Sequence, residues 1–226
     1  MSTYIVASVG AWNREYFNQQ TYQLDGDWYF CSTPEDLEHL LGIHNPRYIF
    51  FPHWRWIVPE KTTLDYECVC FHMTDVPYGR GGSPLQNLIL RGHKTTRLSA
   101  LRMVKEADAG PVYCKHPLDL SGSAQTIYQR STEQIWSIIG YIIQHQPEAI
   151  EQSGKVVSFA RRKPAQSRIP KELELVKIYD YIRMLDAEGY PHAFMEADGY
   201  RLSFTEAKLE NSQQLSATVV IELVKE

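Results

Sequence analysis

Three features of the segment from residue 67 to residue 113 combine residue types that can do chemistry. The apolar run ECVCFH ends on His72, and open α/β sheets place ligands at the carboxyl ends of their strands. The glycine-rich stretch YGRGGSP comes next and leads into a helix at Ser83 or Pro84, so its backbone can approach a ligand closely. Asp108 follows the strand-like run LSALRMV, in the turn-forming sequence EADAG. Each feature is common by itself, whereas the three in this order predict a ligand site with a base and a carboxylate.

The elements that must position these residues follow an α/β pattern. The β-rich runs TYIVASV, DWYFC, RYIFFP and ECVCFH are separated by other segments, one of which begins a helix at Pro34 after a Ser32 or Thr33 cap. Near-continuous apolar runs are typical of parallel strands that are covered on both faces. We therefore expect an α/β, Rossmann-like fold with a mostly parallel sheet and helices on both faces.

The second half of the chain predicts two helices and an antiparallel tail. Apolar residues at helical spacing predict a long helix over residues 123–146 and a second one that ends at Gly189. Between them, residues 154–171 are basic and polar and are expected to form a surface loop. The alternating tail predicts an antiparallel meander, at which two copies of the chain could pair. We predict a catalytic domain over residues 1–150 and a linker, a helix and a small C-terminal antiparallel β appendage over residues 151–226.

Composition and charge argue against several classes of protein. The chain has 226 residues, of which 43% are hydrophobic, enough to bury a sizeable core. Its net charge of −4 and the lack of a long run of Lys and Arg argue against a nucleic acid as the main partner. The start of the chain lacks the basic and apolar regions of a signal peptide, and no apolar run approaches the roughly 20 residues of a membrane span. We expect a cytoplasmic protein that does not enter a membrane.

The four cysteines predict neither a disulfide framework nor a metal site. Cys68 and Cys70 lie two residues apart in one apolar run, while Cys31 and Cys114 are isolated. No further Cys or His pair at ligand spacing completes a tetrahedral set. We expect free thiols and no metal.

Around His72 the chain resembles the N10-formyltetrahydrofolate-dependent formyltransferases, a family whose members act on methionyl-tRNA, glycinamide ribonucleotide or amino sugars. The family signature runs Asn-x-His, then x-Ser-Leu-Leu-Pro-x-Tyr-Arg-Gly-x-x-Pro-x-Gln, and continues with G-x-x-x-T and M-x-x-x-x-D-x-G. The positions of this chain that match it without a gap are His72, Pro77, Arg80, Gly81, Pro84, Gln86, Gly92, Thr96, Met103, Asp108 and Gly110. The resemblance is looser in the long helix and in the segment IRMLDAEGYPHAF.

One position departs from this signature. Cys70 stands two residues before His72, where the family has its catalytic Asn. A thiol is a much weaker hydrogen-bond donor than an amide. Either another group takes over the role of that Asn, or Cys70 merely lines the site; we treat Cys70 as its positional equivalent.

The resemblance implies attack of a neutral amine on the formyl carbon carried by N10 of the folate. His72 would accept the proton of the amine, since an unperturbed histidine has a pKa of about 6.5. Protonated His72 would also stabilise the developing oxyanion, and Asp108 would orient the imidazole. The implied catalytic set is His72, Asp108 and Cys70.

The resemblance also implies binding roles for two loops. The pterin of the folate would lie between the loop FFPHWRWIVP and the loop that leads to Asp108, where the two tryptophans either stack on its rings or anchor their loop to the core. The predicted folate-binding residues are Trp54, Arg55, Trp56, Ile57, Val58, Lys105 and Asp108. The predicted substrate-binding residues are Met73, Thr74, Tyr78, Gly79, Arg80 and Gly81.

Among the acceptors of the family, the sequence favours a nucleotide-linked amino sugar of the UDP- or dTDP-linked 4-amino-4,6-dideoxyhexose type, as used for surface polysaccharides. A tRNA would require a basic surface and a larger C-terminal domain. Glycinamide ribonucleotide or another small amine is an alternative acceptor, although the family members that act on glycinamide ribonucleotide do not usually carry YGRGGSP. A non-catalytic folate or nucleotide binder is the other alternative. It would explain the missing Asn, but an inert relative would tend to lose His72 as well.

Overall fold

The computed structural model describes residues 1–224 of the chain. It contains two compact units, each built from three segments. The first unit comprises Met1–Gly81, Thr96–Leu118 and Gln129–Ser158, and the second comprises Gly82–Thr95, Asp119–Tyr128 and the chain from Phe159 onward. The division at residue 150, into a catalytic domain and a C-terminal appendage, stays a prediction. Among the described residues, no helix is both long and apolar enough to cross a membrane.

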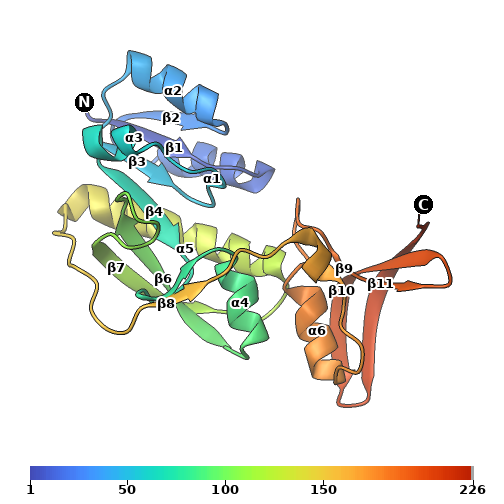
Figure 1. Ribbon diagram of the computed structural model, residues 1–226. Helices are drawn as coiled ribbons and strands as arrows, with labels where there is room; N and C mark the ends of the chain where they lie inside the picture. The colour runs from blue at the N-terminus through green and yellow to red at the C-terminus, as the bar shows by residue number, and fades with distance from the viewer. Residues whose placement is uncertain (225–226) are drawn as a thin grey trace. The chain divides into compact units, whose positions relative to one another are not determined.

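The first unit is built on a six-stranded sheet with the strand order β2-β1-β3-β4-β6-β7 (Figure 1). Its strands are β1 (Thr3–Ala7), β2 (Asp27–Cys31), β3 (Tyr48–Phe51), β4 (Cys68–His72), β6 (Thr95–Arg102) and β7 (Val112–Asp119). The β1–β2, β1–β3 and β3–β4 pairs are parallel, whereas β4 and β6 are antiparallel. The predicted mostly parallel, Rossmann-like sheet is confirmed, with β6 as a strand of opposite direction.

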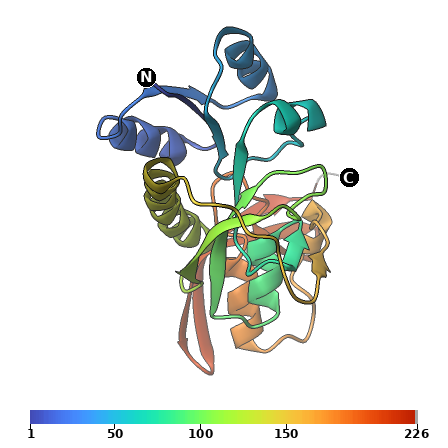
Figure 2. The same ribbon diagram turned by 90° about the vertical axis from the view of Figure 1, so that its left-hand side faces the viewer.

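The helices of this unit cover both faces of the sheet, because alternate strand residues point to opposite faces. They are α1 (Ala11–Thr21), α2 (Pro34–Ile43), α3 (Glu60–Asp65) and most of α5 (Ala124–His145). On one face, Phe17 of α1 lies 5.2 Å from Phe30, and Trp136 of α5 lies 6.1 Å from Trp28, between ring centroids. On the other face, Leu37 of α2 joins the buried cluster of the remaining strand residues. Figures 1 and 2 show α1 and α2 on opposite sides of the strands.

The glycine-rich stretch is more ordered than a free loop. Tyr78–Gly81 form β5, which pairs with β8 (Val157–Phe159) in a two-stranded sheet. The helix α4 (Pro84–Leu90) then begins as the sequence predicts, after Ser83 in a left-handed conformation without a side-chain cap. Pairing with β8 therefore uses backbone groups that the sequence analysis left open to a ligand. The predicted surface loop over residues 154–171 contains β8 and a short 3-10 helix.

The second unit contains the antiparallel tail that the sequence predicts. Its sheet has the order β11-β10-β9, formed by β9 (Ala193–Ala197), β10 (Tyr200–Asn211) and β11 (Gln214–Leu223). The helix α6 (Leu175–Arg183) packs against β10. Arg183 is buried, donates to Asp180 (2.7 Å) and donates to the carbonyl oxygens of Leu120 and Gly122 (2.6 and 3.0 Å). These bonds connect α6 to the segment that precedes α5.

Candidate active site

His72 lies at the carboxyl end of β4, with its side chain 8% exposed. Its Nδ1 is 3.4 Å from Oδ1 of Asp108, and its Nε2 is 2.7 Å from the carbonyl oxygen of Gly79. A histidine and a carboxylate that are 36 positions apart in sequence therefore meet, as the sequence analysis expects. Their types and separation suit a base that is oriented by a carboxylate.

Both ring nitrogens of His72 face oxygen acceptors. A neutral imidazole has one N–H and can donate to only one of them, whereas the protonated ring donates to both. Nε2 is at hydrogen-bond distance from its acceptor, whereas Nδ1 and Asp108 lie farther apart. The ring nitrogen that points away from Asp108, Nε2, already has the carbonyl oxygen of Gly79 as a hydrogen-bond partner.

Asp108 is held in a left-handed turn with a φ of 56°. Aspartate adopts this conformation more readily than most residues. Its Oδ2 accepts a hydrogen bond from the backbone N–H of Gly81 (2.9 Å), which leaves Oδ1 for His72. Two residues later, a Cβ at Gly110 would lie 1.8 Å from the carbonyl oxygen of Arg102. The spacing D-x-G in this turn is therefore a steric requirement.

Cys70 lies on the same strand as His72, two residues earlier. Burial raises the pKa of its thiol far above the usual value, and the nearby charge of Asp108 raises it further. The thiol is therefore neutral at physiological pH. It is also a weak donor, so it does not replace the hydrogen bond of the amide found at this position in the family. A catalytic role of Cys70 stays a prediction.

Three of the predicted substrate-binding residues support the site from within the protein. Thr74 is fully buried and donates through Oγ1 to the carbonyl oxygen of Gly79 (3.3 Å), and Met73 is 4% exposed. The guanidinium of Arg80 faces Gln152 and does not project freely into solvent. Thr74 therefore supports the carbonyl of Gly79, Arg80 is connected to the Asp108 turn through Gln152, and Met73 is buried. The other three candidates, Tyr78, Gly79 and Gly81, all lie on β5.

The loop after β3 divides the predicted folate-binding residues into two groups. Trp54 and Val58 pack against the buried cluster, and the rings of Trp54 and Trp56 lie 4.8 Å apart. Trp56 is 43% exposed and Ile57 is 95% exposed. Trp54 thus anchors the loop, whereas Trp56 and Ile57 present apolar surface to solvent beyond the carboxyl end of β3. Such a surface fits a flat ring system.

The two predicted cationic residues of the folate site are both exposed. Arg55 lies in the same loop, and Nζ of Lys105 is 3.3 Å from Oε2 of Glu60. His53, the second residue of this loop, was not predicted from the sequence and has a φ of 53°. Burial and the charge of Arg55 lower the pKa of His53 to about 4, and its Nε2 is 3.0 Å from Oγ1 of Thr132.

Gln152 is the other residue that the sequence analysis missed. Its Nε2 donates to the carbonyl oxygens of Asp108 (2.8 Å) and Gly110 (2.7 Å). A single glutamine in a polar segment carries no spacing signal, and its partners lie more than 40 positions away in sequence. Only the folded chain reveals the contact.

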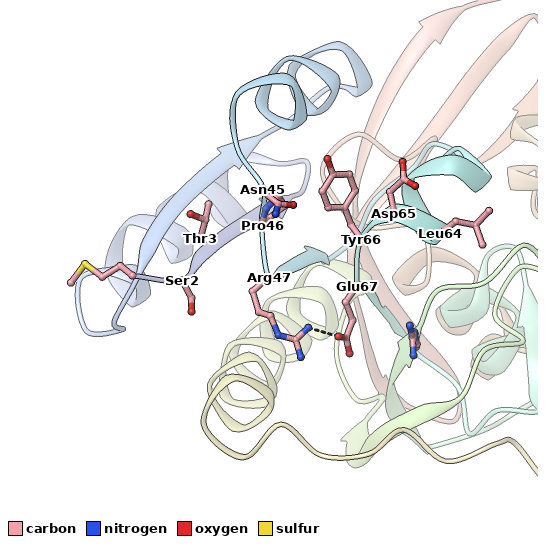
Figure 3. Close-up of a pocket in the computed structure, with 11 residues that line it drawn as sticks. Ser2, Thr3, Asn45, Pro46, Arg47, Leu64, Asp65, Tyr66 and Glu67 are labelled. Atoms are coloured by element: carbon pink, nitrogen blue, oxygen red, sulfur yellow. Dashed lines mark hydrogen bonds and ion pairs between the residues drawn. The ribbon is translucent and has the colours of Figure 1, made fainter.

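A polar depression of about 470 Å³ lies elsewhere on the first unit (Figure 3). Its lining includes Thr3, Arg47 and Glu67, which stand at the amino-terminal ends of β1, β3 and β4. Figure 3 shows Arg47 paired with Glu67, and Tyr113 donates to the same carboxylate (2.7 Å). This depression is at the edge of the sheet opposite to His72 and belongs to a separate polar network. Within residues 1–224, no group of three or more His, Cys, Asp or Glu side chains could hold a metal ion.

Comparison with known proteins gives matches in both sequence and structure. A family profile described as methionyl-tRNA formyltransferase, C-terminal domain, matches residues 164–222. A methionyl-tRNA formyltransferase structure from Clostridium thermocellum is 40% identical, with a TM-score of 0.95, over 99% of this chain and 100% of that one. The methionyl-tRNA formyltransferase of Malacoplasma penetrans (strain HF-2) is 25% identical over 177 residues, which are 74% of this chain and 53% of that protein. The chain thus spans about half the length of such curated relatives.

A sugar N-formyltransferase from Shewanella sp FDAARGOS_354 shares the fold at lower similarity. Its structure has a TM-score of 0.68 and 13% identity, over 91% of this chain and 97% of that one. Identity at this level supports the fold alone.

Proposed function

Because the chain belongs to the methionyl-tRNA formyltransferase family, we propose that it transfers a formyl group from N10-formyltetrahydrofolate to the amino group of a methionyl-tRNA. The observation that carries this proposal is the His72–Asp108 pair at the carboxyl end of β4. It supplies a base and its orienting carboxylate in a chain that is 40% identical to a methionyl-tRNA formyltransferase over its whole length.

The expectation of an amino-sugar acceptor, and with it a role in surface polysaccharide synthesis, is wrong. The sugar enzyme from Shewanella is 13% identical, against 40% for the Clostridium thermocellum protein. The net charge of −4 misled the sequence analysis, because it averages over the chain. Residues 159–171 contain five basic and no acidic side chains, Arg161, Arg162, Lys163, Arg168 and Lys171. The tail that was judged too short for tRNA is matched by the C-terminal profile.

The exposed residues at the carboxyl edge of the sheet fit the formyl donor. Trp56 and Ile57 present apolar surface there, and the carboxylate of Asp108 lies 3.4 Å from the ring of His72. When bound, the folate supplies the electrophilic formyl carbon. In this proposal the chain's own residues hold the donor, orient His72 and accept a proton.

His72 acts as the base in the neutral tautomer that carries its proton on Nδ1, toward Asp108, so that the lone pair of Nε2 accepts the proton of the attacking amine. In this structure Nε2 faces the carbonyl of Gly79. Asp108 stabilises the positive charge that the ring gains. For this step the acceptor amine must take the place of the Gly79 carbonyl at Nε2. The charge that develops on the formyl oxygen then faces a protonated ring, an arrangement that speeds acyl transfer. His72 finally gives the same proton to N10 as the bond between N10 and the formyl carbon breaks, so that tetrahydrofolate can leave.

The test is a formyl-transfer assay with N10-formyltetrahydrofolate and three acceptors: methionyl-tRNA, glycinamide ribonucleotide and a dTDP-linked 4-amino-4,6-dideoxyhexose. We expect release of tetrahydrofolate with methionyl-tRNA. His72→Asn should lower kcat by at least about 100-fold, the range of general base catalysis, while folate binding persists. Turnover with a small amine but not with methionyl-tRNA would refute the proposed acceptor. More than a tenth of wild-type kcat in His72→Asn would refute the role of His72.

A further inference from the structure

The turn that carries Asp108 is connected to β5 through the side chain of Gln152. Nε2 of Gln152 donates to the carbonyl oxygens of Asp108 (2.8 Å) and Gly110 (2.7 Å). Its Oε1 accepts two hydrogen bonds from Arg80, from Nε (3.1 Å) and from Nη2 (2.9 Å). One amide group therefore contacts both the turn and the strand.

The hydrogen-bonding capacity of this amide is fully used. A glutamine has two N–H donors and two lone pairs on its oxygen, and all four are engaged here. Rotating the amide by half a turn would place its NH2 group against the guanidinium of Arg80 and its oxygen against two carbonyl oxygens. Four attractive contacts would become four repulsive ones. The orientation of Gln152 is therefore fixed by its partners.

Gln152 contacts Asp108 through the backbone carbonyl of this residue and not through its carboxylate. Gly81, the residue after Arg80, donates its N–H to Oδ2 of Asp108 (2.9 Å). The turn is thus connected to β5 twice, once through the carboxylate of Asp108 and once through Gln152. Nη1 of Arg80 also lies 3.5 Å from Oε1 of Glu106, but this carboxylate is 77% exposed, and such a surface pair adds little. The two connections to β5 hold the left-handed conformation of Asp108 and direct Oδ1 toward His72.

We propose that Gln152 is a positioning residue, which holds the turn over residues 106–110 so that the carboxylate of Asp108 faces His72. Arg80 belongs to the same clamp, since its guanidinium fixes the amide. The inference deepens the proposed formyl transfer and rests on it for its catalytic readout. It assigns Gln152 no contact with a substrate.

Two substitutions test the clamp in different ways. Gln152→Met keeps a side chain of similar length and removes the amide. Gln152→Glu keeps an acceptor for Arg80 but places an oxygen against the two carbonyls of the turn. We expect either change to lower kcat by about 10- to 100-fold, with the KM values for methionyl-tRNA and the folate within about threefold, because a positioning loss affects the reaction step more than binding.

The matched control is Gln134→Met on α5. Gln134 is also partly buried in the first unit and donates one hydrogen bond, to the carbonyl oxygen of Pro117 (3.0 Å). This hydrogen bond does not involve any residue of the turn that carries Asp108. Its kcat should stay within about twofold of wild type. An equal loss of kcat in the control would overturn the assignment to Gln152.

A double-mutant cycle separates positioning from a general structural effect. If Gln152 acts through Asp108, then adding Gln152→Met to Asp108→Asn should lower kcat by less than about twofold further. If the two losses multiply in full, Gln152 acts independently of Asp108 and the proposal is overturned.

Hydrogen exchange tests the clamp without any substrate. The amides of residues 106–110 should exchange at least about tenfold faster in Gln152→Met than in wild type, and not in Gln134→Met. Unchanged exchange in Gln152→Met would overturn the proposal. Wild-type protein that is inactive with methionyl-tRNA would refute the proposed function, while the exchange rates would still decide whether the clamp exists.

Discussion

Asp108→Asn is the sharpest perturbation that the site offers. The substitution removes one negative charge and leaves the size of the side chain unchanged. Asparagine also tolerates the left-handed conformation at this position, where φ is 56°. Its amide oxygen can still accept the N–H of Gly81. The variant should therefore fold, and its effect should report on the charge near His72.

The distance between His72 Nδ1 and Asp108 Oδ1 sets the size of this effect. Two unit charges 3.4 Å apart interact by about 5 kcal/mol at an effective dielectric constant of 20. The imidazole gains only part of its charge in the transition state, and the carboxylate is 19% exposed and partly screened. We expect a loss of about 3 to 4 kcal/mol, which lowers kcat by roughly 100- to 1000-fold.

The assay follows tetrahydrofolate release under saturating N10-formyltetrahydrofolate and methionyl-tRNA. Glu106→Gln is the matched control, since it removes a carboxylate from the same turn whose side chain is 77% exposed. The control should change kcat by less than about threefold. The reasoning would be refuted by a folded Asp108→Asn enzyme that keeps more than a third of wild-type kcat, or by an equal loss in Glu106→Gln.

Three further predictions concern the surroundings of the site. Cys70→Ala should change kcat by less than about tenfold, and iodoacetamide should label Cys70 slowly at pH 8, because burial raises the pKa of the thiol; rapid inactivation that the folate blocks would contradict this. Gly110→Ala should lower the free energy of unfolding by about 3 kcal/mol or more and lower Tm by at least about 6 °C, because the added Cβ would lie 1.8 Å from the carbonyl oxygen of Arg102. A Tm equal to that of the wild type would contradict this. The pKa of His53 is lowered to about 4 in the fold, so between about pH 6.5 and pH 4 the unfolded chain binds the extra proton and stability falls as pH falls. This proton linkage lowers the free energy of unfolding by up to about 2 kcal/mol between pH 7 and pH 5. His53→Asn should remove it, so that Tm falls by about 4 to 8 °C less over this pH range than in the wild type. Equal losses of Tm in both proteins would show that His53 does not titrate in this way.

Features that depend on neighbouring residues could be predicted from the sequence. Thr33 caps α2, because its Oγ1 accepts the N–H of Asp36 three residues later (3.1 Å), and Pro34 occupies the first turn. The apolar runs form strands in the predicted places, and those of β1, β3 and β4 are largely buried, whereas the edge strand β2 buries only Cys31. The signature around His72 identified the family for the same reason, because its spacing is written in one continuous segment.

Features that depend on distant partners could not be predicted. The spacing around Asp108 indicated a turn, but the contact of Gln152 with that turn joins residues 44 positions apart. Likewise, nothing local marks Thr74 as fully buried or directs the guanidinium of Arg80 into the protein. The exposure of a side chain is decided by which segments fold over it.

The fold and the site as a whole show the same division between what local sequence determines and what tertiary contacts decide. The sequence by itself determined the fold class and the family, and it predicted the contact between His72 and Asp108, because those depend on local pattern and on residue type. It could not determine the direction of β6, the pairing of β5 with β8 or the saturation of the Gln152 amide, which the tertiary structure decided. Backbone pairing and hydrogen-bond satisfaction are properties of the folded chain, since each group must find a partner in space and not in sequence.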